Sequence, residues 1–408
     1  MGIRLTGSVF FLMSLLLPLS SADFHEPAWR FITGGRIRAA PAIGRDGHLY
    51  FISDDRYLYS LTGQGEKRWR YYLEDRLTDC FALGFDGSVY IGFKSGRLAA
   101  VHGYGRKIWE FDSGGTLTTP PAVRSDGTVI LATEEGTLYA VSHTGTLRWR
   151  LPLPSPPAAA PVVDADKSAY MPLTNGTLAV ITPWGECVRQ IKLEGIPGAP
   201  ALGGEGRLYV GTSAGILYAF DETDTPVWRV PLGGKLATPI VGNDDTVYVT
   251  SDLGLLAAID ANGRVRWTRR FPSATAGPAA LGKSGTVYAA TAASLYAVDN
   301  KGNIEWQAPL KGTPTHLLLS PGGLLFSGSD DWSMYAFPAE PPAASPWPLD
   351  RQDVYRTGRS RRSPVFHSAA FLHDPGYLYY RELLFSGSPD LMRKALSEIE
   401  LLTERQTL

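Results

Sequence analysis

The sequence predicts an all-β protein, an eight-bladed β-propeller of four-stranded blades. Three observations predict it: tryptophans recur at a nearly constant spacing, short apolar segments and turns alternate between them, and the same text returns in each period. Successive tryptophans are 40 residues apart between Trp29 and Trp149, and 39 residues apart between Trp228 and Trp306. The following residues form the expected series of blade-docking tryptophans: Trp29, Trp69, Trp109, Trp149, Trp228, Trp267, Trp306 and Trp347.

Each period contains four short segments that read as strands. A small-residue segment such as AAPAI (39–43) is followed by a tight turn, which is Asp-Gly at 46–47, 86–87 and 126–127. Such dipeptides supply the positive φ of a two-residue hairpin turn. Segments such as LYF and LYSL follow, and the fourth segment ends at the next tryptophan. A single blade cannot bury both of its faces, so we expect the blades to close into a ring.

The number of blades follows from the segments between the tryptophans. Eight sets of three begin near residues 39, 79, 119, 158, 198, 237, 276 and 315. We expect the Trp29 segment to complete the eighth blade and to close the ring; Trp347 is the alternative for that outer position. Between Trp149 and Trp228 one tryptophan is missing, and Val188 occupies its expected place.

Composition argues against several classes of function. The formal net charge is -1, whereas nucleic-acid binding usually requires a basic excess. The seven histidines form no HxH or HExxH pair, so we expect no metal site. We also expect no nucleic-acid partner and a monomeric protein.

The first 22 residues read as a secretory signal. Arg4 supplies a basic start, residues 9–19 are apolar, and Ser20-Ser21-Ala22 resembles a cleavage site. No cysteine lies near that site, so we do not expect a lipoprotein. No later segment is long and apolar enough to cross a bilayer. We therefore expect an exported protein, periplasmic or extracellular, with a propeller at 23–347.

Three stretches resemble the repeat of the pyrroloquinoline-quinone (PQQ) propeller family, which ends in LYA(L/V)D…G…W. They are GTLYAVSHTGTLRW (136–149), GILYAFDETDTPVW (215–228) and SLYAVDNKGNIEW (294–306). In that family the tryptophan docks between neighbouring blades. The stretch SPWPLDRQDVYRTGRS (345–360) is similar to a WP…D…TGRS segment that ordinarily precedes the first blade of such proteins, whereas here it follows the last. We assign 348–362 to this segment and a linker.

The resemblance raises the question of a cofactor. Quinone-dependent dehydrogenases of this family carry adjacent cysteines, a calcium site and a catalytic aspartate, and calcium requires clustered oxygen ligands. The two cysteines here are Cys80 and Cys187, and most acidic residues occupy the same turn in successive repeats. The compact repeats also leave no room for a quinone pocket. We expect no enzyme, no cofactor and no catalytic residues.

The resemblance is then to the non-enzymatic, BamB-like members of the family. It implies a scaffold that binds protein partners in the bacterial cell envelope, with outer-membrane protein assembly as the setting. The alternatives are a ligand- or glycan-binding sensor and, below that, a PQQ-dependent dehydrogenase.

The connections between blades are the candidate partner-binding sites, because such loops share one rim and vary freely. Segment 71–79 (YYLEDRLTD) departs most from its sisters, which carry mainly Gly and Thr, and segment 31–38 adds two basic residues. The candidate residues are Arg36, Arg38, Glu74, Asp75, Arg76 and Asp79. Charged rim loops direct partner choice more than they add affinity; the alternative is ordinary solvated loop charge.

Residues 363–408 change character and predict a C-terminal helical extension. Ser388, Pro389 and Asp390 form a helix start, and Leu391, Ala395, Ile399 and Leu402 share one helical stripe. We expect these helices to pack on the propeller; docking of a partner is the alternative.

Overall fold

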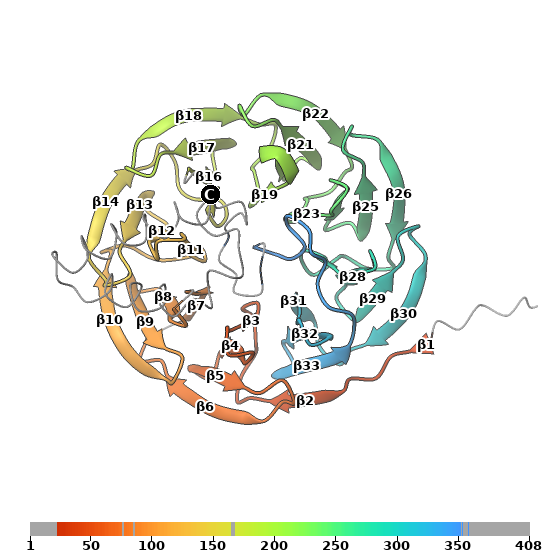
Figure 1. The fold of residues 1–408 in the computed structure, drawn as a ribbon, viewed down its shortest axis with the longest axis horizontal. Helices are drawn as coiled ribbons and strands as arrows, with labels where there is room; N and C mark the ends of the chain where they lie inside the picture. Colours follow the sequence, from red (N-terminus) through yellow and green to blue (C-terminus); the bar gives the residue numbers. More distant parts are fainter. Residues whose placement is uncertain are drawn as a thin grey trace, which may run out of the picture.

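The computed structural model describes residues 23–351, 353 and 358, except 76, 85 and 165–167 and the side chains of 23, 24, 77, 79 and 205. Eight antiparallel sheets are arranged around an axis as the blades of a closed propeller (Figure 1). The predicted eight-bladed, four-stranded architecture is confirmed. The expected signal segment (1–22) and helical extension (363–408) lie outside the described residues.

Each blade contributes one strand to each of four concentric positions. The innermost strands are β3 (Ala42–Ile43), β7 (Leu77–Leu83), β11 (Ala122–Val123), β15 (Val162–Val163), β19 (Ala201–Leu202), β23 (Ile240–Val241), β27 (Ala280–Leu281) and β31 (Pro314–Leu319). The second strands are β4 (Leu49–Ser53), β8 (Val89–Phe93), β12 (Val129–Ala132), β16 (Ala169–Pro172), β20 (Leu208–Gly211), β24 (Val247–Thr250), β28 (Val287–Ala290) and β32 (Leu324–Ser329).

The remaining strands complete the blades, which we number 1 to 8 from the blade of β3. The third strands are β5 (Tyr57–Leu61), β9 (Arg97–His102), β13 (Thr137–Val141), β17 (Thr177–Ile181), β21 (Ile216–Phe220), β25 (Leu255–Ile259), β29 (Ser294–Val298) and β33 (Ser333–Pro338). The outer strands are β6 (Lys67–Tyr72), β10 (Arg106–Asp112), β14 (Leu147–Pro152), β18 (Cys187–Lys192), β22 (Pro226–Pro231), β26 (Val265–Arg270), β30 (Ile304–Pro309) and β2 (Trp29–Ile32).

The first hairpin turn of a blade depends on the Asp-Gly pairs found in the sequence. The Asp126 carboxylate accepts the backbone N–H of Thr128 at 3.0 Å, and Gly127 adopts a φ of 75°. An L-residue with a Cβ rarely adopts this backbone conformation, which explains the glycine. The second and third strands of a blade are buried because both faces of the sheet pack against neighbouring blades at these positions.

The two ends of the propeller chain close the ring together. Strand β2 pairs with β33 in blade 8, with Trp29 opposite Ala336, so the Trp29 segment completes this blade as expected. Strand β1 (Asp23–Phe24) adds a fifth, parallel strand to the outer edge of blade 7. Together β1 and β2 tie the start of the propeller to its last two blades.

Six of the eight seams between blades have the same construction. A tryptophan of one outer strand covers a glycine in the last turn of the next blade, and its indole N–H donates to a carbonyl in that turn. Trp149 Nε1, for example, donates to Pro183 O at 2.7 Å, and a Cβ on Gly185 would lie 2.6 Å from the Trp149 ring. The six tryptophans are Trp29, Trp69, Trp109, Trp149, Trp228 and Trp267.

The other two seams use different residues. In blade 4 Arg189, rather than the expected Val188, stands in the tryptophan position, because it lies opposite Val180 just as Trp149 lies opposite Ala140. Its guanidinium donates to Thr223 O and lies 3.8 Å from the Asp224 carboxylate. Trp306 of blade 7 stacks on His25, with ring centroids 4.5 Å apart.

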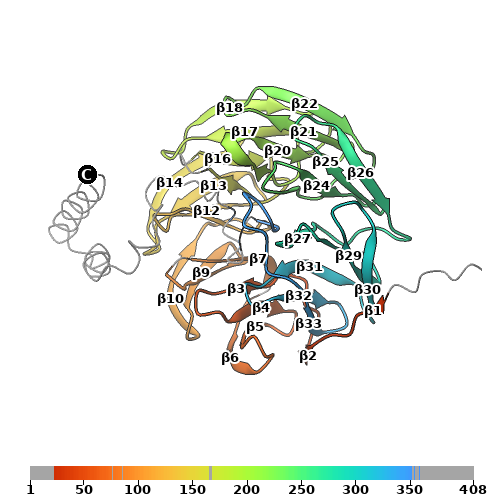
Figure 2. The ribbon, with the colours of Figure 1, turned by 45° about the vertical axis from the view of Figure 1, so that its right-hand side comes forward.

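The segment after β33 crosses the axis of the ring, and we call residues 339–351 the axial segment (Figure 1 and Figure 2). Trp347 belongs to this segment and not to an outer strand; it is 0% exposed, and its carbonyl accepts the N–H of Val241 in β23. Its distance of 41 residues from Trp306 resembles the repeat, but the chain has already left the last blade. Arg351 donates to Pro121 O at 2.6 Å, so the segment joins opposite sides of the ring.

Among the described residues, no helix has the length and apolar character that crossing a bilayer requires.

Candidate functional site

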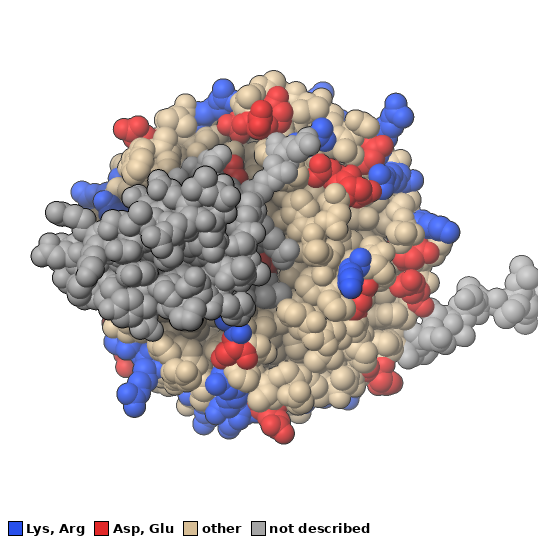
Figure 3. Space-filling view, viewed as in Figure 1, with Lys and Arg blue, Asp and Glu red and all other residues tan. Residues whose placement is uncertain are grey.

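The blades present two different faces to the surroundings. The hairpin face carries the turns between first and second and between third and fourth strands; the connection face carries the blade-to-blade connections and the turns between second and third strands. On the face drawn in Figure 3, acidic and basic side chains are mixed around the rim rather than gathered by sign. Such a surface has no single-sign field that would attract a polyanion.

Four of the predicted rim residues, Arg36, Arg38, Glu74 and Asp75, lie in connections on the connection face. Arg36 and Arg38 belong to the connection from β2 to β3; Arg38 Nε donates to Asp54 at 2.9 Å. Asp75 follows β6 and lies 3.4 Å from Arg97. Glu74 beside it is exposed. Arg76 and the side chain of Asp79 lie outside the described residues.

Three exposed apolar side chains lie beside these charges. Ile32 is 61% exposed, Trp332 50% and Tyr72 49%. Ile32 and Trp332 are neighbours, because Ile32 is opposite Ser333 and the next residue, Thr33, donates its N–H to Trp332 O. Tyr72 packs edge-on against Tyr57, with ring centroids 5.5 Å apart.

These residues lie along the connection face of blades 8, 1 and 2, at the ends of neighbouring strands and in the connections that follow them. Gly34 N–H donates to the Asp55 carboxylate at 2.8 Å, which joins the blade 8 end to the first turn of blade 1 on this face. Leu73 N–H donates to Arg56 O, which carries the strip on to Glu74 and Asp75. We define the connection-face strip as Ile32, Arg36, Arg38, Tyr72, Glu74, Asp75 and Trp332. An apolar patch rimmed by mixed charge is typical of a protein-binding surface.

The apolar members of the strip were not among the residues predicted from sequence. Trp332 has a φ of 70°, and at the same turn position five sister blades carry a glycine with positive φ: Gly96, Gly136, Gly176, Gly215 and Gly254. A bulky residue in this conformation costs backbone energy that a glycine would avoid. A tryptophan in a glycine position is therefore the departure from the repeat that could have revealed this site.

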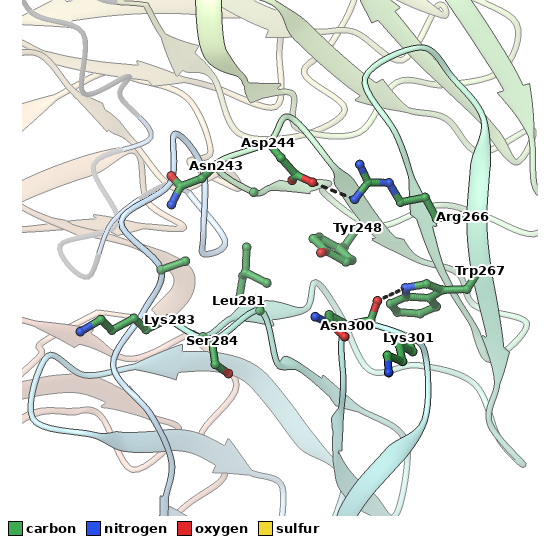
Figure 4. Close-up of a pocket in the computed structure, with 14 residues that line it drawn as sticks. Asn243, Asp244, Tyr248, Arg266, Trp267, Leu281, Lys283, Ser284, Asn300 and Lys301 are labelled. Atoms are coloured by element: carbon green, nitrogen blue, oxygen red, sulfur yellow. Dashed lines mark hydrogen bonds and ion pairs between the residues drawn. The ribbon is translucent and has the colours of Figure 1, made fainter.

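The hairpin face carries notches between blades, and the notch between blades 6 and 7 is a cavity of about 510 Å³ (Figure 4). Asp244 and Arg266 form an ion pair of 2.7 Å across its wall. Burial raises the pKa of Asp244, but hydrogen bonds from Thr246 and Arg266 and the charge of Arg266 outweigh it and hold that pKa below its usual value. The same pair recurs as Asp46–Arg68 and Asp126–Arg148, so its first role is to hold the blade together.

The axis of the propeller does not fit a quinone with its calcium ion. Trp347 and Leu349 are fully buried there, and Arg351 is tied to the carbonyls of Pro120 and Pro121. Among the described residues, no group of three or more His, Cys, Asp or Glu side chains converges to hold a metal. The two cysteines are separate thiols, Cys80 buried and Cys187 exposed.

Fold and seams together define a class: an eight-bladed β-propeller of tryptophan-docked, PQQ-like repeats. The family described as "outer membrane protein assembly factor BamB" matches residues 94–182, 174–317 and 254–373. This chain belongs to that PQQ-like, BamB-type repeat family. A search of curated proteins found no match.

Solved structures share the architecture. BamB from Moraxella catarrhalis superposes with a TM-score of 0.64 at 18% identity, over 77% of this chain and 99% of that one. A computationally designed protein, Ika8, superposes with a TM-score of 0.65 at 16% identity, over 75% of this chain and 98% of that one. A designed ring and a natural assembly factor match equally well, so these likenesses identify the fold and not the function.

Proposed function

We propose that this protein is a non-catalytic scaffold of the bacterial cell envelope that binds protein partners through the connection-face strip. The proposal rests on Trp332, a half-exposed tryptophan in a backbone conformation for which five sister blades use glycine and blade 1 uses Arg56. Proteins retain strained residues where function requires them. Membership in a family described by an outer-membrane assembly factor supports the setting, outer-membrane protein assembly.

The location follows from the same proposal. The protein is exported by the signal at 1–22, works in the periplasm or at the cell surface, and acts as a monomer. An enzyme is disfavoured because the axial residues do not fit the quinone and calcium site of the family's dehydrogenases.

The chemistry of the strip indicates the kind of partner. Ile32, Tyr72 and Trp332 offer apolar contact, while Arg36 and Glu74 supply charges of both signs at the margin. Aromatic anchors within a polar rim are typical of protein interfaces, where a few such anchors supply most of the binding energy.

Affinity purification with full-length protein as bait tests the proposal. The variant Trp332→Gly removes the indole and restores the residue that five sisters use, so the fold is expected to gain or keep its stability. We expect it to lose an outer-membrane assembly component that the wild type retains in stoichiometric amount. Leu253→Ala is the matched control, because Leu253 is 62% exposed in the corresponding turn of blade 6. Equal recovery with both variants would contradict the proposal.

A further inference from the structure

The cavity between blades 6 and 7 differs from the notch between blades 1 and 2 in its volume and in the polar groups that line it. Tyr248 and Leu281 project into its middle, Asp244, Arg266 and Trp267 form one wall, and Asn243, Lys283, Asn300 and Lys301 lie around its margin (Figure 4). Ala343 of the axial segment also lines it. Its volume of about 510 Å³ is within the range of small-ligand pockets.

Tyr248 carries a hydroxyl without a protein partner in this cavity. The residue is only 7% exposed, yet its hydroxyl makes no hydrogen bond within the described part of the chain. The equivalent Tyr50, in the notch between blades 1 and 2, donates to Asp46 at 2.9 Å. Burial, with the nearby Asp244 charge, raises the pKa of Tyr248, so the phenol keeps its proton and remains a donor at neutral pH. The hydroxyl faces the cavity, where a ligand or a water molecule can accept its hydrogen bond.

The charged side chains that line the cavity are one carboxylate and three cations, and the Glu340 carboxylate lies beside them, bonded to Ser284. Asp244 is neutralised by Arg266, whereas Lys283 and Lys301 form no ion pair with any described residue. Their side chains lie at the margin, and a flexible four-carbon stem lets each ammonium fold over a bound anion.

The sister notch between blades 1 and 2 offers a comparison inside the same molecule. It is smaller, about 340 Å³, and its two arginines, Arg45 and Arg68, stand against two carboxylates, Asp46 and Asp86. Its tyrosine hydroxyl is already bonded to one of these carboxylates. The repeat therefore explains the notch itself, and the equivalent Tyr209 of blade 5 also carries a hydroxyl without a partner. The blade 6–7 cavity differs from the blade 1–2 notch in its larger volume and in its two lysines, which form no ion pair with a described residue.

We propose that the blade 6–7 cavity binds a small anionic sugar, a sugar acid or a sugar phosphate. Lys283 and Lys301 receive the carboxylate or phosphate, and the Tyr248 hydroxyl with the amides of Asn243 and Asn300 bonds the sugar hydroxyls. Trp267 and Leu281 supply apolar surface for the C–H face of the ring. This site is a second binding function, on the opposite face from the connection-face strip, and it does not depend on the scaffold proposal.

Calorimetric titration of the full-length protein tests this site with three probes: glucuronate, glucose 6-phosphate and uncharged glucose. We expect saturable binding of glucuronate, of glucose 6-phosphate or of both, and glucose at least tenfold weaker. Whichever anion binds more tightly identifies the source of the charge. Tyr248→Phe is expected to weaken binding about tenfold, as for loss of one hydrogen bond in a closed site, and the double variant K283Q/K301Q about a hundredfold.

Both sets of variants are expected to fold, because the groups they remove have no protein partner among the described residues. Thermal unfolding verifies this for each variant. Tyr50→Phe and Arg45→Gln, in the sister notch, are the matched controls and should bind like the wild type. The proposal is overturned if no probe binds at millimolar concentration, if glucose binds as tightly as the anions, or if the sister-notch variants lose as much affinity as Tyr248→Phe.

Discussion

The seam between blades 3 and 4 and the seam between blades 4 and 5 solve one problem with different residues. At the first, Trp149 covers Gly185 and donates to the carbonyl of Pro183, two residues earlier. At the second, Arg189 donates to Thr223 O and faces Asp224, whose φ of 59° shows that it stands in the glycine position. Both members of the pair are exchanged together.

The comparison separates what a seam requires from what the repeat usually supplies. The bond from an outer-strand side chain to a carbonyl of the next blade is retained, while the apolar cover is replaced by an ion pair. Asp224 also accepts the Tyr170 hydroxyl at 3.2 Å, so the exchanged pair is anchored within its own seam. A tryptophan placed opposite Asp224 would press on a carboxylate instead of a bare glycine.

The largest effect is expected from the tryptophan seam. Trp149→Ala removes the ring and its hydrogen bond and leaves a gap between two blades. We expect about 3 kcal/mol of lost unfolding free energy, at the low end for tryptophan truncation because Trp149 is only partly buried. Urea unfolding followed by far-UV circular dichroism measures it. A loss no larger than that of Arg189→Ala would refute the greater contribution of the apolar seam.

A glycine pair comes next in size. Gly185→Ala places a Cβ against the Trp149 ring in a backbone of φ 88°, so both strain and displacement contribute, about 2 kcal/mol. Gly47→Ala is the control: its φ is 75°, but nothing lies within 4 Å of the added Cβ, and about 1 kcal/mol is expected. Equal losses in thermal melts would mean that the indole exerts no steric demand.

The interaction between Arg189 and Asp224 can be measured as a coupling energy between two substitutions. Arg189→Trp alone should destabilise by about 1 kcal/mol, because the new ring meets Asp224 and the carboxylate loses its cation. Adding Asp224→Gly should recover this loss and rebuild the seam of the other blades. A double-mutant cycle without coupling would show that the two positions do not interact.

The smallest expected effect is a loss of stability at acidic pH. Burial raises the pKa of Asp126, but hydrogen bonds from Thr128 and the Arg148 charge hold it below the usual value. The folded pKa is thus below the unfolded value of about 3.9, so the contribution is complete above that pH and is lost as the pH falls through the folded pKa. Both side chains are about half exposed, so about 0.5 kcal/mol is expected. Asp126→Asn should flatten the acid limb of the stability curve; an unchanged limb would contradict this.

The architecture was predictable because its determinants are local and repeated. The tryptophan spacing and the turns at 46–47, 86–87 and 126–127 recur in one order, and only a ring of blades buries such strands. The closing role of Trp29 followed from counting the strands. The axial position of Trp347 did not, because its spacing resembles the repeat while its contacts are with distant blades.

The candidate site was only partly predictable, for a physical reason. Arg36, Arg38, Glu74 and Asp75 could be proposed from the sequence because charge in a turn differs from the Gly and Thr of the other repeats. The exposure of Ile32 and Tyr72 depends on where each outer strand ends on the connection face. That position is set by the packing of the blades around the ring and cannot be read from the local sequence. The Arg189 seam was hidden by a one-residue change in repeat length, which pointed to Val188 instead.

Site-specific photo-crosslinking in the cell envelope reports whether this propeller binds its partner where the repeats diverge. A photoreactive side chain would replace Trp332 in the strip or, as the matched control, Leu253 in the equivalent turn of blade 6. We expect a discrete adduct with an outer-membrane assembly protein from position 332 and none from position 253. Adducts of equal yield from both positions, or an adduct from position 253 alone, would contradict it.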